Sequence, residues 1–165
     1  MGRSTGAGLR LDEELAAFIQ GAVSVVACSR SADMIPDAVR ACGCRVSRDR
    51  RRVTVLVEPS RAGEVLGQVA ANGAIAVVFS HPSSHRTIQL KGSDATLVRA
   101  TGADRAVVER HLREWVEDLC SIGYGREFAK ALHGLPDAAL VAIRFTPAAA
   151  FQQTPGPMAG HRLGS

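Results

Sequence analysis

The segment between Ser84 and Gly92 contains the polar side chains of this sequence that could act together on a ligand. Its residues alternate in character, so an extended strand here has one polar face and one mainly apolar face. The polar face consists of His85, Thr87, Gln89 and Lys91, and the other face of Arg86, Ile88 and Leu90. Such a row aims hydrogen-bonding groups at one surface, as a ligand site requires. A sheet face exposed to water has the same pattern, and this alternative stays open.

Covalent and acid–base catalysis find little support in the sequence. Ser84 and His85 are neighbours, but neighbouring residues of a strand point to opposite faces, and no Gly-x-Ser-x-Gly elbow occurs. Three other histidines could act as bases, but they are predicted to lie apart from one another. His81 falls in a turn, and His111 and His133 fall in two different helices. No pair of carboxylates has the pattern of a glycosidase site. The catalytic residues are therefore left unassigned.

A metal site is not predicted. Cys42 and Cys44 lie two residues apart on one predicted strand, but no Cys-x-x-Cys or His-x-x-x-His supplies further ligands. We expect reduced, mostly buried thiols.

Most of the chain reads as short strands with helices between them. Leu11–Gln20 predicts an amphipathic helix capped by Asp12. The predicted strands are Val23–Ser29, Asp37–Ser47, Val53–Val57, Ala74–Phe79, His85–Arg99 and Ala139–Thr146. The other predicted helices are Ala62–Ala71, Asp104–Ile122 and Arg126–His133. Three sequential strands with short connections favour an antiparallel meander, so we expect an α+β, mainly β protein, a barrel with outer helices.

Length and composition suit one domain. The 165 residues, 46% of them hydrophobic, can bury a core built from aliphatic side chains, since aromatic residues make up only 4%. We expect a single domain over residues 1–165 with flexible ends at 1–10 and 156–165.

The charge pattern argues against nucleic acid, and the hydropathy against a membrane. The formal net charge is +4, but the densest basic run, at residues 48–52, reads as a hairpin turn and has no flanking aromatic residues for base stacking. No apolar run approaches the roughly 18 residues of a membrane span, and the first residues lack the apolar region of a secretory signal. We expect a cytoplasmic protein.

The segment Ser84–Gly92, which follows an AVVFS strand and a proline-containing turn, resembles the flavin-binding segment of the FMN-binding split-barrel family. That family includes pyridoxamine 5'-phosphate oxidase, and its strand of the form R-[QT]-x-x-x-x-G runs past the isoalloxazine ring. Arg86, Thr87 and Gly92 match this form. The resemblance extends more loosely over residues 15–155. It implies an antiparallel split β-barrel with outer helices.

The resemblance also implies roles for individual residues. A Ser-Arg pair at a helix start binds the FMN phosphate in the family, and Ser60 and Arg61 stand where that pair would be. The family usually continues with Lys where this chain has Ala62, so we take Arg40 as the second cation. Thr87 and Gln89 would contact the edge of the isoalloxazine ring, and Ser84, His85 and Arg86 would complete the site.

The family binds FMN between the subunits of a homodimer. The resemblance therefore implies a homodimeric flavoprotein, an oxidoreductase acting on a small-molecule substrate, in which the segment Phe151–Thr154 comes from the second subunit. A pyridoxamine phosphate oxidase needs further substrate-binding residues near its C-terminus, and this chain lacks that set. Three alternatives stay open: the same fold with a deazaflavin, the same fold with haem at His81 or His85, and a non-catalytic dimeric flavin-binding module.

Overall fold

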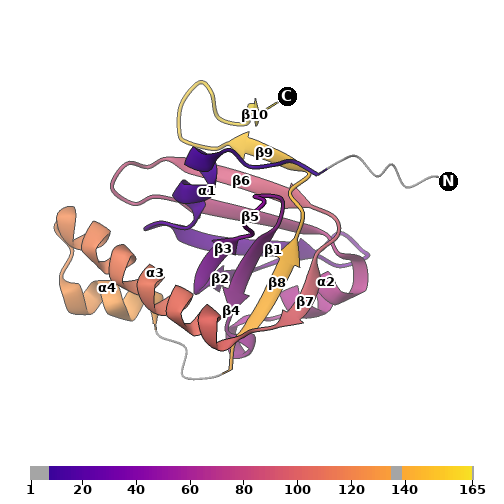
Figure 1. Ribbon diagram of the computed structural model, residues 1–165, viewed down its shortest axis with the longest axis horizontal. Helices are drawn as coiled ribbons and strands as arrows, with labels where there is room; N and C mark the ends of the chain where they lie inside the picture. The colour runs from indigo at the N-terminus through magenta and orange to yellow at the C-terminus, as the bar shows by residue number, and fades with distance from the viewer. Residues whose placement is uncertain (1–7, 135–138, 165) are drawn as a thin grey trace.

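The computed structural model describes residues 8–134 and 139–164. Within these ranges ten strands form two antiparallel sheets. The larger sheet has the order β10-β9-β6-β5-β1-β2, with β1 (Ser24–Arg30), β2 (Pro36–Ala41), β5 (Ile75–Ser80), β6 (Thr87–Gly92), β9 (Ala149–Gln152) and β10 (Arg162–Leu163). The smaller sheet has the order β3-β4-β8-β7, with β3 (Gly43–Val46), β4 (Val53–Val57), β7 (Thr96–Arg99) and β8 (Val141–Phe145). The helices are α1 (Glu13–Ile19), the 3-10 turn η1 (Pro59–Arg61), α2 (Val65–Asn72), α3 (Gly102–Ser121) and α4 (Arg126–His133). The expected α+β, mainly β barrel with outer helices is confirmed (Figure 1).

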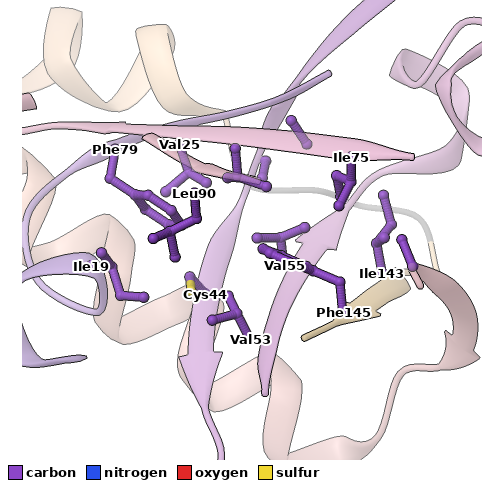
Figure 2. Packing of buried hydrophobic residues seen from close by; sticks show 14 of the residues in the cluster. Ile19, Val25, Cys44, Val53, Val55, Ile75, Phe79, Leu90, Ile143 and Phe145 are labelled. Atoms are coloured by element: carbon purple, nitrogen blue, oxygen red, sulfur yellow. The ribbon is translucent and has the colours of Figure 1, made fainter. Parts of the chain in front are cut away.

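The main core lies between the two sheets. Alternate residues of each strand point inward, and Figure 2 shows aromatic and aliphatic side chains from both sheets meeting there. Phe79 of the larger sheet and Phe145 of the smaller one are almost completely buried. α1 adds Leu15 and Ile19, and α2 adds Val65 and Val69, to the same core. The two helices thus cover the open ends of the barrel.

The outer faces of the two sheets differ. α3 covers the smaller sheet, where Val108 packs against Leu56 and Ala142. The N-terminus of α3 is fixed there by Asp104, whose fully buried carboxylate pairs with Arg45 of β3. On β1, β5 and β6 of the larger sheet, no outward-facing residue is buried. This accessible face is therefore where a ligand or a second subunit could bind.

The strand predicted over Asp37–Ser47 is two strands in different sheets. β2 ends at Ala41 and β3 begins at Gly43, so the chain crosses between the sheets at Cys42. A Cβ on Gly43 would meet Val107 and Val108 of α3 at about van der Waals distance, as expected for a close-packing point. The crossing separates the two cysteines, because Cys42 packs under α3 while Cys44 lies in the main core.

The C-terminal segment is ordered by pairing. Composition predicts a flexible end from residue 156, whereas β10 pairs with β9, and the Gly160 amide donates to the Gln152 carbonyl. β9 in turn pairs with β6. The first seven residues of the other predicted flexible end lie outside the described ranges. Among the described helices none is long and apolar enough to cross a membrane.

Candidate functional site

The polar row of β6 lies on the accessible outer face of the larger sheet. Thr87 and Gln89 are half-buried and Lys91 is exposed, while Ile88 and Leu90 point into the core. The strand begins at Thr87 and not at His85 as predicted. His85 has a left-handed φ of 58°, and its amide donates to the His81 carbonyl, so it belongs to the preceding turn. The row therefore consists of three residues.

Neighbouring strands extend the polar surface around Thr87. The Thr87 and Ser80 hydroxyls share a hydrogen bond of 3.0 Å. Ser80 is paired in register with Ser24 of β1, whose hydroxyl accepts a hydrogen bond of 2.9 Å from Arg40 Nη1. A series of hydroxyl groups thus runs across the sheet from Thr87 to Arg40. Ser24 and Ser80 were not predicted as site residues, although each occupies an outward position of an apolar strand.

Arg40 and Arg61 lie close to the same residue, His133 at the end of α4. Arg40 stacks over Trp115 of α3, with 5.9 Å from its guanidinium carbon to the ring centroid, and Trp115 is 6.2 Å from the His133 ring. The Arg61 guanidinium lies against Gly134, the residue after His133. Burial lowers the pKa of His133, the hydrogen bond with the Gly134 carbonyl partly opposes this, and the positive charges of Arg40 and Arg61 lower it further. The two predicted cations therefore both lie in the surroundings of His133.

His133 forms a buried pair with His111 of α3. The two ring centroids are 5.1 Å apart, and both side chains are almost inaccessible to water. Burial, followed by the charges of His133 and Arg110, lowers the pKa of His111 to about 3. Both rings are therefore neutral near pH 7, and the charged groups beside them are the arginines.

Ser60 and Arg61 do not stand at the start of α2. They belong to η1, and α2 begins at Val65, because the chain turns at Gly63 with a φ of 50° next to the Asp37 carboxylate. The predicted helix-start site for an anion is therefore wrong in its geometry. Ser60 donates to Glu58 Oε1 at 2.9 Å, and Arg61 Nε lies 3.0 Å from Glu58 Oε2. About half of the Arg61 side chain stays exposed.

The turn between β5 and β6 is attached to α3. Ser83 Oγ donates to Asp118 Oδ1 at 2.6 Å, and its amide donates to Oδ2 at 3.1 Å. Ser84 Oγ lies 3.2 Å from Nδ1 of His81, whose Nε2 is 3.6 Å from Asp118. Ser84 is thus part of the turn's own hydrogen bonding. Both ring nitrogens of His81 already have polar neighbours.

Arg86 lies apart from the row. Its Nη1 pairs with Glu14 of α1 at 2.8 Å, and its guanidinium carbon is 4.5 Å from the centroid of the Phe18 ring. Both partners belong to α1, so Arg86 attaches this helix to the end of the barrel. Arg40, Arg61, Thr87 and Gln89 are the predicted site residues that the accessible face and its edge bring together.

The segment after β9 lies beside the row within the same chain. The Thr87 amide donates to Thr154 Oγ1 at 3.0 Å, and Gln153 Nε2 donates to Gln89 Oε1 at 3.4 Å. Within the chain β9 pairs with β6, and the contribution of this segment to the site of a second subunit stays a prediction. Because the Gln89 oxygen is engaged by Gln153, the Gln89 amide nitrogen remains for other partners.

Two hollows accompany these residues. A cavity of about 310 Å³ opens at the Lys91 end of the row and includes Cys28, Ala76 and Gly92 in its wall. A larger hollow of about 740 Å³ lies between α3 and α4 and is lined by Leu112 and Val116 among others. We regard the first as part of the candidate site because it shares a strand face with Thr87 and Gln89.

The donor set on this face fits a flavin mononucleotide. The outward side chains of β5 beside the row are small: Val78 lies opposite Gln89, and Ser80 lies opposite Thr87. Arg40 stands three strands away from Gln89, or about 14 Å at about 4.8 Å per strand. An extended chain with an anionic end could connect these groups, and guanidinium pairs are well suited to phosphate.

Solved structures share this fold, although no family model and no curated protein sequence matches the chain. An F420 reductase is 16% identical, with a TM-score of 0.55, and the match covers 85% of this chain and 98% of that one. A candidate pyridoxamine 5'-phosphate oxidase from Lactobacillus delbrueckii is 14% identical, with a TM-score of 0.53 and coverages of 92% and 99%. General stress protein 26 from Bacillus anthracis is 14% identical, with a TM-score of 0.52 and coverages of 95% and 100%. The chain thus has the split-barrel fold of pyridoxamine 5'-phosphate oxidase-like proteins.

Proposed function

We propose that this split barrel binds FMN on the outer face of its larger sheet and acts as an oxidoreductase on a small molecule. The observation that carries the proposal is the placement of two cations and two polar side chains on one accessible face and at its edge. Arg40 and Arg61 both lie near enough to His133 to lower its pKa, and Thr87 and Gln89 lie across the sheet from Arg40. The fold supports the oxidoreductase part of the proposal, because the solved structures named above include a candidate pyridoxamine 5'-phosphate oxidase and an F420 reductase.

Each residue has a distinct task in this arrangement. Arg40 and Arg61 hold the phosphate by charge-assisted hydrogen bonds. The Thr87 hydroxyl and the Gln89 amide nitrogen contact the ring edge, and Gln153 holds the Gln89 carboxamide in one orientation. The flavin supplies the two-electron chemistry, while the protein positions it and excludes competing reactions. No acid–base residue of this chain is required for that division of labour.

We also propose that the same face pairs two copies of the chain. Val26, Val78 and Phe151 stand outward on neighbouring strands and are only partly covered. Replacing Val78 with Arg should raise the dimer dissociation constant at least about tenfold, because an unpaired charge would be buried. Sedimentation velocity measures this, and Leu97→Arg, at an exposed position of the smaller sheet, is the matched control. A monomeric wild-type protein, or equal effects of both variants, would contradict the proposed interface.

An absorbance spectrum tests the cofactor. Protein incubated with FMN and desalted should keep both visible flavin bands. A deazaflavin is the second candidate, because one structure with this fold is an F420 reductase, and its retention in place of FMN would change the assignment. A Soret band would indicate haem. Protein that stays colourless with every added cofactor would support the non-catalytic module.

A further inference from the structure

The cavity at the Lys91 end of the row has an unusual charge pattern. Lys91 lies two residues beyond Gln89 on the same face of β6. Across the sheet it is paired with Ala76 of β5, which is paired in turn with Cys28 of β1. Arg30 contributes a second cation to the wall of the cavity. No acidic side chain lines it among the residues that the structure describes. The residues that line this open hollow of about 310 Å³ therefore include two cations beside small and apolar side chains.

Neither cation has an anionic partner among the residues that the structure describes. Within residues 8–134 and 139–164, no carboxylate lies within 4.0 Å of Lys91 or Arg30. Lys91 Nζ is 5.1 Å from the centroid of the Phe151 ring, and Arg30 Nη1 donates to the Ser31 carbonyl at 3.3 Å. These contacts leave most of the five donors of Arg30 and the three of Lys91 free for an anion.

Asp37 is the acidic residue whose charge reaches the cavity, since it contributes, after burial, to the raised pKa of Cys28. Its Oδ1 accepts from the Ala38 amide and its Oδ2 from the Glu64 amide, each at 2.8 Å, and these neutral amides leave its negative charge in place. Asp37 therefore offsets part of the positive potential, but among the described residues it forms no ion pair with Lys91 or Arg30.

We propose that this cavity binds the anionic end of the substrate, a carboxylate or a phosphate, beside the ring held at Thr87 and Gln89. This inference rests on the proposed function. The alternation of β6 places residue Lys91 one step, about 7 Å, beyond Gln89 along the same face, and its ammonium group lies over the Phe151 ring. A second copy covering the face would strip water from both cations, and a bound anion offsets that cost.

The test uses the rate at which iodoacetamide alkylates Cys28 in the full chain, followed by peptide mass spectrometry with and without FMN. Cys28 lines the cavity and is half-buried, whereas Cys120 on α3 is half-buried elsewhere and is an internal reference. Benzoate, inorganic phosphate and neutral benzamide are the probes. Benzoate or phosphate should slow alkylation of Cys28 and leave Cys120 unchanged, and the more effective of the two identifies the anion.

Substitution of the cation gives the decisive comparison. Lys91→Met should raise the half-protecting concentration of the effective anion about tenfold, as loss of a hydrogen bond to a charged group does. Lys130→Met, at an exposed site on α4, is the matched control and should have no effect. Equal protection by benzamide, or equal effects of the two variants, would overturn the anion site.

The two proposals fail separately. Protection of Cys28 by an anion in protein that retains no FMN would support the cavity and contradict the flavin. Retention of FMN with no protection by either anion would overturn the cavity inference alone. Protection in both forms, together with a change in the visible flavin bands on addition of the anion, would support both.

Discussion

Replacing Arg40 and Arg61 together with Gln should lower the affinity for FMN at least about 100-fold, because each hydrogen bond to a charged group contributes about 1.5–3 kcal/mol. The two side chains come from β2 and from the η1 turn, and both lie near His133. Their contacts within the protein are a hydrogen bond from Arg40 to the Ser24 hydroxyl, the stacking of Arg40 over Trp115, and the pairing of Arg61 with Glu58. The loss should therefore fall on ligand binding more than on stability. Equilibrium dialysis against FMN measures it.

A second double variant separates this effect from a general loss of positive charge. Arg51→Gln combined with Arg99→Gln removes the same charge from exposed positions, one in the turn before β4 and one on the smaller sheet. This control should bind FMN as the wild type does. Riboflavin, which lacks the phosphate, should bind the Arg40/Arg61 variant and the wild type alike. Normal FMN retention by the Arg40/Arg61 variant would locate the phosphate elsewhere.

Acidification should destabilise the fold through His111 and His133. Both pKa values are lowered in the folded protein, that of His111 to about 3, against about 6.5 in an unfolded chain. Below pH 6.5 the unfolded state therefore binds more protons than the folded state. The stability contributed by the neutral rings is complete above pH 6.5 and is lost as the pH falls toward their folded values. Each buried histidine should lower the free energy of unfolding by up to about 1.4 kcal/mol per pH unit.

The single tryptophan of the chain reports this change directly. Trp115 lies 6.2 Å from the His133 ring, so urea unfolding followed by its fluorescence between pH 7.5 and 5 gives the slope. His133→Gln should reduce the slope, because it removes one of the two titrating groups. His161→Gln, on an exposed residue, should leave it unchanged. A free energy of unfolding that stays constant over this range would show that the pair does not titrate as described.

Several features of the fold followed from residues close together in the chain. Asp12 caps α1 by accepting from the Leu15 amide, as predicted, and α4 spans Arg126–His133 as the periodicity indicated. The alternation of β6 separated Thr87 and Gln89 from Ile88 and Leu90. Each of these depends on a repeat of two or 3.6 residues, or on one cap, so a short window contains all the necessary information.

The site could be predicted only in part, because its contacts join residues that are far apart in the sequence. Arg86 fits the family's strand form, yet its partners Glu14 and Phe18 lie about 70 residues earlier, on a helix whose position no local pattern gives. Ser60 and Arg61 appeared to start a helix, but Gly63 and the distant Asp37 carboxylate set the turn between them and α2. The crossing at Cys42 likewise depends on a distant strand, because Gly43 pairs with Leu56 of β4 in the smaller sheet.

The sequence by itself determined most of the helices and the central strands, the inward and outward residues of β6, and the resemblance that points to a flavin. The tertiary structure alone decided that Arg40 and Arg61 both lie near His133 and that Gln153 and Thr154 lie against the row. It also decided that Lys91 and Arg30 line one cavity, with no acidic side chain in its wall among the described residues. The physical reason is the range of the interactions. Backbone preferences and side-chain periodicity act over a few residues, whereas strand pairing and the neutralisation of charge depend on residues that only the folded chain brings together.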